Sequence, residues 1–418
     1  MYNGYTMTRD DCLALDQQDP LAYTQERFSV PDDTIYLDGN SLGVMPKGTP
    51  ARVLEMVERE WGQGLVRSWN AEGWFDKPRS LGDRLAPLIG AGPGEVVVCD
   101  STSINIFKVV VAALRLRPGR RLIVSDQDSF PTDLYMIEGA MSFFENYESR
   151  LVDMSSASGL KLALSDDVAV VVLSHVDYRT GLLHDMESIT AQVHAAGALM
   201  IWDLAHSAGA LPVQLEACGA DFAVGCTYKY LNGGPGAPAF VYAAKKHQER
   251  AIQPLSGWHG HANPFGFEIR YEPAQGISRF ICSTPPLLSY AGLESGLDAW
   301  EGVDLQHIRE KSMRMTSLFI DLVRERCSVW PVEIASPENS QLRGSQVSLR
   351  HPNSYAVMQR LIERNVVGDF RAPDLMRFGF TPLYLKYTDV WDAVEVLRET
   401  LADGSWQGSR YSQRALVT

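Results

Sequence analysis

The stretch Val168-Ala169-Val170-Val171-Val172-Leu173-Ser174 is apolar along its whole length apart from its last residue. A strand that faces water on one side alternates apolar and polar side chains, whereas a strand covered on both faces does not. This stretch therefore predicts a central strand of a parallel sheet with helices on both sides. The fold class that it favours is α/β.

Similar short segments alternate with longer amphipathic ones from about residue 95 to residue 245. The other predicted strands are Glu95–Cys99, Arg121–Ser125, Leu199–Asp203, Asp221–Gly225 and Ala239–Tyr242. The predicted helices between them are Ile104–Leu116, Asp133–Asn146 and Met186–Ala196. Such alternation is typical of crossover connections in a parallel sheet.

The pattern changes after about residue 290, where long helices are predicted at Leu287–Trp300 and Leu305–Cys327. Another helix is predicted before the sheet, at Thr49–Trp61. A length of 418 residues favours two or three domains. We predict a large domain over residues 61–300 and a smaller α+β domain formed by residues 1–60 and 301–418.

Composition and charge restrict the partners of the chain. Its 51 acidic and 38 basic residues give a net charge of −13, which argues against a nucleic-acid partner. The longest apolar run is far too short to cross a membrane, and the N-terminus lacks the features of a signal peptide. Six scattered cysteines without metal-ligand spacing favour the cytoplasm, with no metal and no membrane association expected.

Polar residues follow the predicted strands at the edge where parallel sheets bind ligands. Ser101, Thr102 and Ser103 follow the first strand and either cap a helix or bind an anion at its N-terminus. Phe130 precedes a proline in the loop after the second strand. Its ring either packs in the protein or stacks on a flat ligand.

Asp203 ends one predicted strand, and Lys229 follows the end of the next predicted strand, Asp221–Gly225. A carboxylate at the tip of a buried strand is costly unless it caps a helix or meets a cation. One such cation is the protonated ring nitrogen of pyridoxal phosphate, with His206 nearby. Lys229 lies between Tyr228 and Tyr230, and an amine desolvated by such neighbours can form a Schiff base.

These motifs resemble those of a known family. Asp203-x-x-His206 and the segment Cys226–Gly236 resemble the class V aminotransferase branch of the fold-type I pyridoxal-phosphate enzymes. Within that branch the chain is similar to the kynureninase family over almost its whole length. The matching segments are Tyr36–Gly43, Phe130–Tyr135, Trp202–Ala210, Leu255–Trp258 and Arg377–Tyr384.

The resemblance implies a large, mainly parallel seven-stranded sheet domain, a smaller α+β domain and a hydrolase that acts on a carbon–carbon bond. The implied reaction cleaves the Cβ–Cγ bond of L-kynurenine, or of 3-hydroxy-L-kynurenine, and gives anthranilate and L-alanine. The implied pathways are tryptophan catabolism through the kynurenine pathway and NAD biosynthesis.

The resemblance also implies roles for individual residues. Lys229 would bind pyridoxal 5'-phosphate and move the Cα proton, Asp203 would keep the ring nitrogen protonated, and Tyr228 is the candidate acid. The other cofactor-binding residues would be Thr102, Ser103, Phe130, Asp133, His206, Tyr228 and Trp258, with Thr284 supplied by the partner subunit of a homodimer. Arg377 would bind the substrate α-carboxylate, and Ser41, Trp69 and His259 would complete the substrate site.

The segment Trp258-His259-Gly260-His261 departs from the family, for which we expect Trp-Phe-Gly-His. His259 is either a flat substitute for phenylalanine or a residue that changes the preference for ring substituents. A metal site at His259 and His261 is not expected, because no third ligand is evident.

Alternative activities of the same branch are cysteine desulfurase, selenocysteine lyase and aminotransferase. A desulfurase or lyase needs a nucleophilic cysteine on a late, mobile loop, and no cysteine follows Cys327. A non-catalytic module would lack Lys229. A nicotinamide-binding enzyme is disfavoured, since no GxGxxG follows the first strand.

Overall fold

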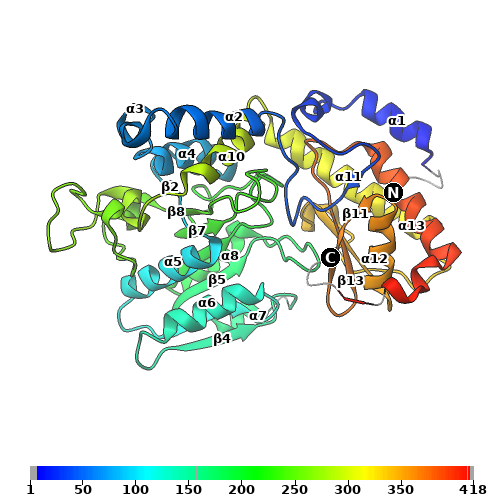
Figure 1. Cartoon of the computed structure of the whole chain (residues 1–418). Helices are drawn as coiled ribbons and strands as arrows, with labels where there is room; N and C mark the ends of the chain where they lie inside the picture. Colours follow the sequence, from blue (N-terminus) through cyan, green and yellow to red (C-terminus); the bar gives the residue numbers. More distant parts are fainter. Residues whose placement is uncertain (1–6, 157, 412, 415–418) are drawn as a thin grey trace. The chain divides into compact units, whose positions relative to one another are not determined.

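The computed structural model describes residues 7–156, 158–411 and 413–414 of the chain. It contains two compact units (Figure 1). The large unit consists of Thr49–Tyr178 and His184–Leu297, and the small unit consists of Met1–Gly48, Arg179–Leu183 and Asp298–Thr418. The outermost residues of the predicted small domain, 1–6 and 415–418, lie outside the described residues.

The large unit is built on a seven-stranded sheet. Its strands are β2 (Val96–Val98), β3 (Leu122–Asp126), β4 (Glu148–Val152), β5 (Val168–Ser174), β6 (Leu199–Asp203), β7 (Phe222–Gly225) and β8 (Phe240–Ala243). They lie in the order β2-β8-β7-β6-β5-β3-β4. All pairings are parallel except those of β8, which is antiparallel to β2 and β7. The predicted mainly parallel α/β fold is confirmed.

Helices connect these strands (Figure 1). They are α5 (Thr102–Leu116), α6 (Pro131–Met141), α7 (Gly159–Ala163) and α8 (Met186–Ala195), whereas α9 (Lys245–Gln248) follows the last strand, β8. The α5 residues Ile106, Val109 and Val110 are buried in one hydrophobic cluster with Ile123 of β3 and Val172 of β5. This packing fixes the N-terminus of α5 at the carboxyl edge of the sheet.

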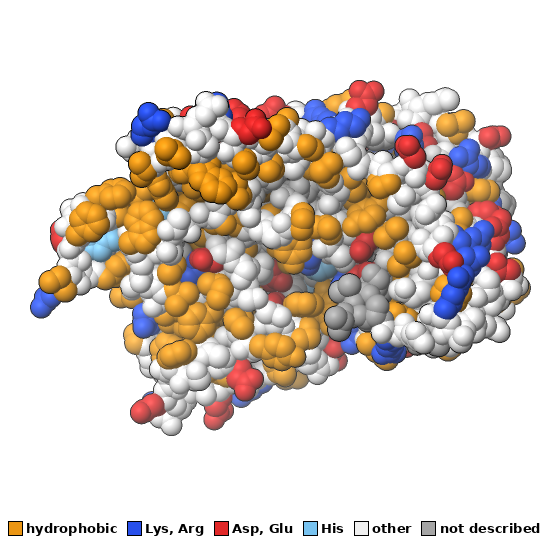
Figure 2. Space-filling model, viewed as in Figure 1, with side chains coloured by type: hydrophobic (Ala, Val, Ile, Leu, Met, Phe, Trp, Pro, Cys, Tyr) orange, Lys and Arg blue, Asp and Glu red, His pale blue; other side chains and the backbone are white. Residues whose placement is uncertain are grey.

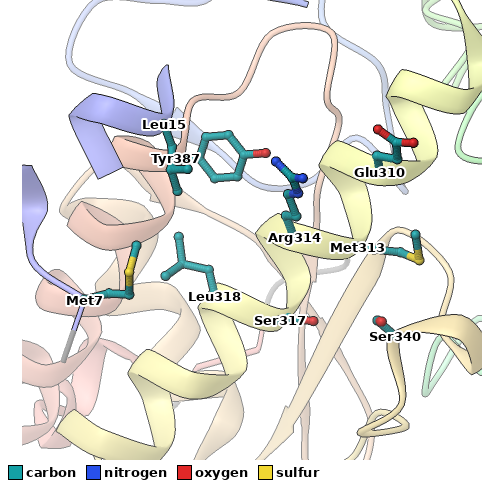
Figure 3. A pocket seen from close by; sticks show the side chains of 9 residues that line it. All are labelled: Met7, Leu15, Glu310, Met313, Arg314, Ser317, Leu318, Ser340 and Tyr387. Atoms are coloured by element: carbon teal, nitrogen blue, oxygen red, sulfur yellow. The ribbon is translucent and has the colours of Figure 1, made fainter. Parts of the chain in front are cut away.

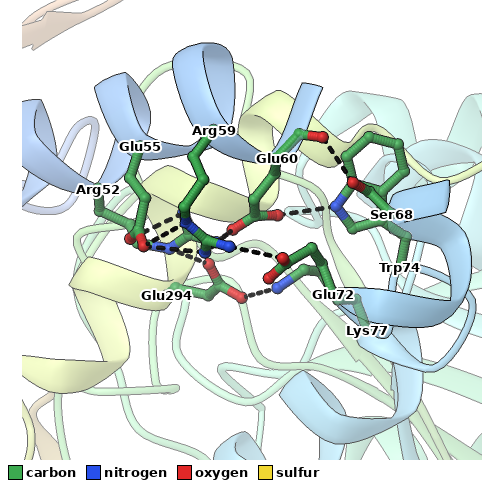
Figure 4. A network of polar contacts seen from close by, with 9 residues as sticks. All are labelled: Arg52, Glu55, Arg59, Glu60, Ser68, Glu72, Trp74, Lys77 and Glu294. Carbon is green, nitrogen blue, oxygen red and sulfur yellow. Dashed lines mark hydrogen bonds and ion pairs between the residues drawn. The ribbon is translucent and has the colours of Figure 1, made fainter. Parts of the chain in front are cut away.

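The structure begins the large unit at residue 49 rather than at the predicted residue 61. Here α2 (Thr49–Glu55) continues into a π-helical turn at Met56–Trp61, and α3 (Ser68–Ala71), α4 (Lys77–Leu85) and α10 (Leu287–Asp298) complete the region. The buried carboxylate of Glu60 accepts hydrogen bonds from Arg52 (2.6 Å) and from the indole of Trp74 (2.8 Å), as Figure 4 shows. Arg52 of α2 also binds Glu294 of α10, which explains why α2 belongs to the large unit.

The small unit is an α+β structure. Its helices are α1 (Arg9–Gln17), α11 (Leu305–Arg326), α12 (Ser354–Glu363) and α13 (Tyr387–Asp403). Strands β9 (Glu333–Ile334), β10 (Gln346–Arg350), β12 (Asp369–Arg371) and β13 (Leu375–Gly379) form an antiparallel sheet, and β1 (Ile35–Tyr36) pairs in parallel with β11 (Val366–Val367). Buried Lys311 joins the two ends of the chain, because its Nζ binds Asp19 and the Pro382 carbonyl, each at 2.6 Å.

A cavity of about 710 Å³ lies beside α1, α11 and α13 in the small unit (Figure 3). It is lined by Met7, Leu15, Glu310, Met313, Arg314, Ser317, Leu318, Ser340 and Tyr387. None of the predicted site residues is among them. No helix in the described part of the chain combines the length and apolar character that crossing a bilayer requires.

Candidate active site

A cavity of about 90 Å³ opens at the carboxyl edge of the large unit's sheet, where β5, β6 and β7 end. Its lining residues are Thr102, Ser103, Phe130, Thr132, Asp133, Ser174, Tyr178, Asp203, Ala205, His206, Tyr228 and Lys229. Eight of the predicted site residues are therefore together here: Thr102, Ser103, Phe130, Asp133, Asp203, His206, Tyr228 and Lys229. Trp258, Thr284, Trp69 and His259 of the same unit are not part of this lining.

Lys229 follows β7 in a turn that brings its amine into the cavity. Its Nζ lies 2.9 Å from Nε2 of His206, which follows β6. This hydrogen bond means that the two residues fix each other's position. Asn232, three residues further on, has a φ of +56°, a left-handed conformation that asparagine tolerates better than most residues.

Asp203 and Asp133 form a buried, hydrogen-bonded pair of carboxyl groups. Burial raises the pKa of both, and the charge of Asp203 raises the pKa of Asp133 further. Asp133 is thus the protonated member that donates to Asp203. Asp203 also accepts a hydrogen bond from the Ala205 backbone N–H at 2.9 Å. The pair can present one ionised carboxylate to a cationic N–H group.

The N-terminus of α5 supplies an anion-binding element. The Ser101 side chain caps the helix by accepting a hydrogen bond from the Ile104 N–H at 3.4 Å. Thr102 and Ser103 form the first turn and line the cavity. The two interpretations of these hydroxyls are therefore compatible, because Ser101 caps the helix and leaves its neighbours at the positive end of the dipole.

Phe130 and Tyr178 form an aromatic wall of the cavity. Phe130 directly precedes α6 as its N-cap residue and is 43% exposed, so its ring is available to a flat ligand. Tyr178 packs edge-on against it, with the ring centroids 5.2 Å apart. Tyr228 also lines the cavity, and burial raises its pKa above the ordinary value for tyrosine. Its hydroxyl is therefore protonated at neutral pH and able to donate.

Trp258, Trp69 and His259 lie together in a separate aromatic cluster of the large unit. Trp258 and His259 belong to a short helical turn at Trp258–Gly260, and Trp69 belongs to α3. The His259 ring is stacked between Phe75 and Trp258, at centroid distances of 4.3 and 4.9 Å. Its Nε2 donates to the Phe75 carbonyl at 2.9 Å, and the side chain is buried. Trp69 meets Trp258 edge-on at 5.8 Å.

Thr284 is exposed in the segment before α10 and does not line the cavity of its own unit. No group of histidine, cysteine, aspartate and glutamate side chains in the described structure could hold a metal ion.

Arg377 and Ser41 lie together in the small unit. Arg377 is buried on β13, directly opposite Asp369 of β12 in the antiparallel register. Its Nε donates to Asp369 Oδ1 at 2.7 Å and its Nη2 donates to Oδ2 of the same carboxylate. Ser41 Oγ donates to Asp369 at 2.7 Å and lies 3.3 Å from Arg377 Nη2. This network fixes the plane of the guanidinium.

Several residues of these sites were not predicted from the sequence: Ser174, Tyr178, Thr132, Asp369 and Asp38. Asp38 follows β1 and lies opposite Gly379 of β13. Burial and the charge of Asp369 raise its pKa to about 7. The sequence does contain a signal for Asp369, because a buried arginine requires a carboxylate partner and a hairpin between residues 369 and 377 can supply it.

The chain is similar in sequence to known proteins. The family model described as "Kynureninase C-terminal domain" matches residues 308–397. Curated kynureninases of Burkholderia pseudomallei (strain K96243) and Pseudomonas fluorescens are each 52% identical to the chain over 416 residues, which cover 98% of the chain and 100% of each relative.

Solved structures resemble the chain in fold. The apo structure of a cysteine desulfurase from Thermococcus onnurineus NA1 has a TM-score of 0.77 at 19% identity and covers 92% of this chain and 98% of that one. A K223A mutant of C-DES, with glycine covalently linked to its PLP cofactor, has a TM-score of 0.76 at 17% identity, over 89% of this chain and 98% of that one.

Proposed function

The chain belongs to the kynureninase family, and we propose that it hydrolyses L-kynurenine to anthranilate and L-alanine with pyridoxal 5'-phosphate as its cofactor. The observation that carries the proposal is the meeting of Lys229, Asp203 and the α5 N-terminus around one cavity. The reaction is a hydrolysis of a carbon–carbon bond. It would place the enzyme in tryptophan catabolism by the kynurenine pathway, with NAD biosynthesis as a second route.

The residues of the cavity fit the cofactor. A buried carboxyl pair that presents one ionised carboxylate suits a protonated pyridine nitrogen, and the N-terminus of α5 suits a phosphate. Lys229 would hold the carbonyl carbon, Phe130 would stack on the ring, and His206 would support Lys229. When bound, pyridoxal phosphate supplies an electron sink for charge that develops on the substrate carbons.

Lys229 and Tyr228 are suited to move protons. The Lys229 amine is the base positioned to take the Cα proton, because His206 fixes its Nζ in the cavity. Water adds to the γ-carbonyl of kynurenine, and the Cβ–Cγ bond breaks to release anthranilate. Cβ of the fragment that becomes alanine must then receive a proton. Tyr228, which is protonated at neutral pH, is our candidate donor.

Four of the predicted residues would bind the substrate: Arg377, Ser41, Trp69 and His259. Arg377 would bind the α-carboxylate of kynurenine through a guanidinium that Asp369 and Ser41 hold in one plane. Trp69 and His259, which both pack against the predicted cofactor-binding residue Trp258, would form the aryl-binding side of the site. The preference between kynurenine and its 3-hydroxy form is assigned to this aromatic cluster.

A homodimer with shared active sites is part of the proposal, since Thr284 is exposed and lies outside the cavity of its own unit. The same region carries exposed apolar side chains, visible in Figure 2, which suit an interface with a second copy. They include Trp61, Leu65, Val66 and Leu288, which are 54%, 57%, 78% and 48% exposed. A groove of about 440 Å³ beside them is lined by Met56, Trp61, Trp74, Pro286, Leu287, Leu288 and Ser289.

The proposed location is the cytoplasm, because six free thiols suit a reducing compartment. A desulfurase activity is not favoured by the cysteines. Cys99, Cys226 and Cys327 are buried, and burial raises the pKa of each thiol, which opposes formation of a nucleophilic thiolate.

The experiment that tests the function is product analysis with three substrates. The purified holoenzyme should release equimolar anthranilate and L-alanine from L-kynurenine, and neither sulfide from L-cysteine nor an amino acid from a keto acid at a comparable rate. Turnover of cysteine or amino transfer in place of kynurenine hydrolysis would overturn the proposal.

A further inference from the structure

Lys108 of α5 is a buried cation that the proposed reaction does not use. Its side chain is fully buried. Its Nζ donates to Asp100 Oδ2 at 2.6 Å, to the Phe280 carbonyl at 2.7 Å and to Cys99 Sγ at 3.3 Å. A buried ammonium is costly unless all of its protons are bound and a negative charge is near, and these three acceptors meet both conditions.

The first of these contacts reaches the anion-binding end of α5. Asp100 directly precedes the helix cap Ser101, and its φ of +50° turns the chain from β2 into the helix. Asn105 supports the same turn by donating to the Cys99 carbonyl at 2.8 Å. The Lys108–Asp100 ion pair therefore fixes the loop that positions Thr102 and Ser103 at the cavity.

The second contact reaches the segment that carries Thr284. Phe280 ends the short helix Gly276–Phe280, and Thr284 lies four residues beyond it. The other end of this segment is also attached to the β2 region, because the hydroxyl of buried Tyr290 donates to the Val98 carbonyl at 2.7 Å. Residues 281–289 are thus held at both ends against the strand and loop that precede α5.

We propose that Lys108 is a positioning residue for the cofactor phosphate and couples two phosphate-binding elements. One is the α5 N-terminus in its own subunit, and the other is the Thr284 segment that reaches the partner subunit's cofactor. The inference rests on the proposed function, since it takes the phosphate and the shared site as given. Through Lys108, the loop that binds phosphate at one site adjusts the segment that binds phosphate at the other.

The test compares cofactor forms that differ only in the phosphate. Pyridoxal 5'-phosphate and pyridoxal are titrated separately into full-length apoenzyme, and their absorbance gives two dissociation constants. In Lys108→Met we expect the affinity for pyridoxal phosphate to fall about tenfold, because the lost charge-assisted contact with Asp100 holds the phosphate-binding loop. The affinity for pyridoxal, which has no phosphate, should change by less than about twofold. Lys108→Arg should recover part of the loss.

Lys311→Met is the matched control. Lys311 is also buried and binds one carboxylate and one backbone carbonyl, but it lies in the small unit. Lys311→Met should lower thermal stability, while the ratio of the dissociation constants for pyridoxal phosphate and pyridoxal stays at the wild-type value. If Lys108→Met does not fold, Asp100→Asn breaks the same ion pair, and asparagine tolerates the left-handed backbone at this position. Asp100→Asn should also weaken the binding of pyridoxal phosphate relative to that of pyridoxal.

Coupling is tested with Thr284→Val and the double variant Lys108→Met/Thr284→Val. If Lys108 acts through the Thr284 segment, the double variant loses less affinity for pyridoxal phosphate than the product of the single losses. Independent losses, or equal losses for both cofactor forms, would overturn the inference. If the wild-type chain binds pyridoxal phosphate and pyridoxal equally well, the proposed function is overturned as well. If the wild type prefers pyridoxal phosphate and Lys108→Met keeps the same preference, only the inference is overturned.

Discussion

The Nζ atom of Lys229 lies 2.9 Å from Nε2 of His206, so two residues 23 positions apart in the chain form one unit of the cavity. His206→Leu removes the acceptor that holds the amine in place. We expect its affinity for pyridoxal phosphate to fall about tenfold, the loss typical of one hydrogen bond to a charged group. His206→Asn, whose amide oxygen can accept, should lose less. Absorbance titration of the apoenzyme measures both, and equal affinities in wild type and His206→Leu would contradict this role.

Tyr228→Phe tests the candidate acid. Since the phenol is protonated at neutral pH and lines the cavity, its removal should lower kcat about a hundredfold or more, the usual contribution of a positioned acid. The kcat of the variant is measured with its sites saturated with pyridoxal phosphate, which separates proton transfer from any loss of cofactor binding. A variant that turns over at the wild-type rate would exclude Tyr228 from the mechanism.

Asp38 makes substrate affinity depend on pH. Burial and the charge of Asp369 raise the pKa of Asp38 to about 7, while Ser41, Arg377 and Arg371 oppose the rise. Above that pH its carboxylate adds a second negative charge beside Asp369 and competes for Arg377. KM for kynurenine should therefore rise as pH increases through about 7. Part of the folding stability should be lost as pH rises from the ordinary aspartate pKa of about 4 to the raised value of about 7.

Asp38→Asn is the matching variant, since it cannot ionise. Its KM should lose the dependence around pH 7, and its thermal midpoint should lose the dependence between about pH 4 and 7, from the ordinary aspartate pKa to that of Asp38. Identical pH profiles in the variant and the wild type would assign the effect to another group.

His259 is tested by substrate preference. The ring is held between Phe75 and Trp258 and its Nε2 is bound to a carbonyl, so it acts on the substrate through the position of Trp258. His259→Phe keeps the stack and loses the hydrogen bond. We expect the ratio of kcat/KM for kynurenine to that for 3-hydroxykynurenine to change severalfold. An unchanged ratio would identify His259 as a flat substitute for phenylalanine.

Glu60 tests the stability of the large unit. Its buried carboxylate binds Arg52 and Trp74, so Glu60→Gln should destabilise the unit by about 3 kcal/mol. The exposed pair of Glu55 and Arg59 is the control, and Glu55→Gln should cost less than about 1 kcal/mol. Thermal unfolding of both variants measures the difference, and similar midpoints would contradict a structural role for the Glu60 network.

The Glu60 network makes folding stability depend on pH with the opposite sign to the effect of Asp38. Burial opposes ionisation of Glu60, but the Trp74 hydrogen bond and the charge of Arg52 outweigh it and lower the pKa. Its contribution to stability is present above the ordinary glutamate pKa and is lost as pH falls through the lowered value.

Central strands and the cofactor cavity could be predicted from the sequence because each depends on local pattern. The bounds predicted for β5 and β6 are confirmed, since both are apolar and end in a polar residue at the sheet edge. Asp203 is the last residue of β6, and Lys229 lies in the turn that follows β7. Strand β4 was not predicted, because its Glu148, Ser149, Arg150 and Leu151 are exposed and show no apolar pattern.

Features that depend on register or packing could not be predicted in this way. Asp369 pairs with Arg377 only because β12 and β13 are antiparallel in that register. The predicted helix Asp133–Asn146 ends early, at Met141, and Asn146 adopts a φ of +62°, which leaves the helical region. The boundary at residue 49 depends on contacts between Arg52 and Glu294, which are 242 positions apart.

The most direct test of the central claim is the site of covalent cofactor attachment. The holoenzyme is reduced with borohydride, digested and analysed by mass spectrometry, with Lys229→Ala treated in parallel. The account predicts a pyridoxyl-phosphate label on the peptide that contains Lys229 and no label at that peptide in the variant. A label on a different lysine of the wild-type chain, or no label at all, would contradict it.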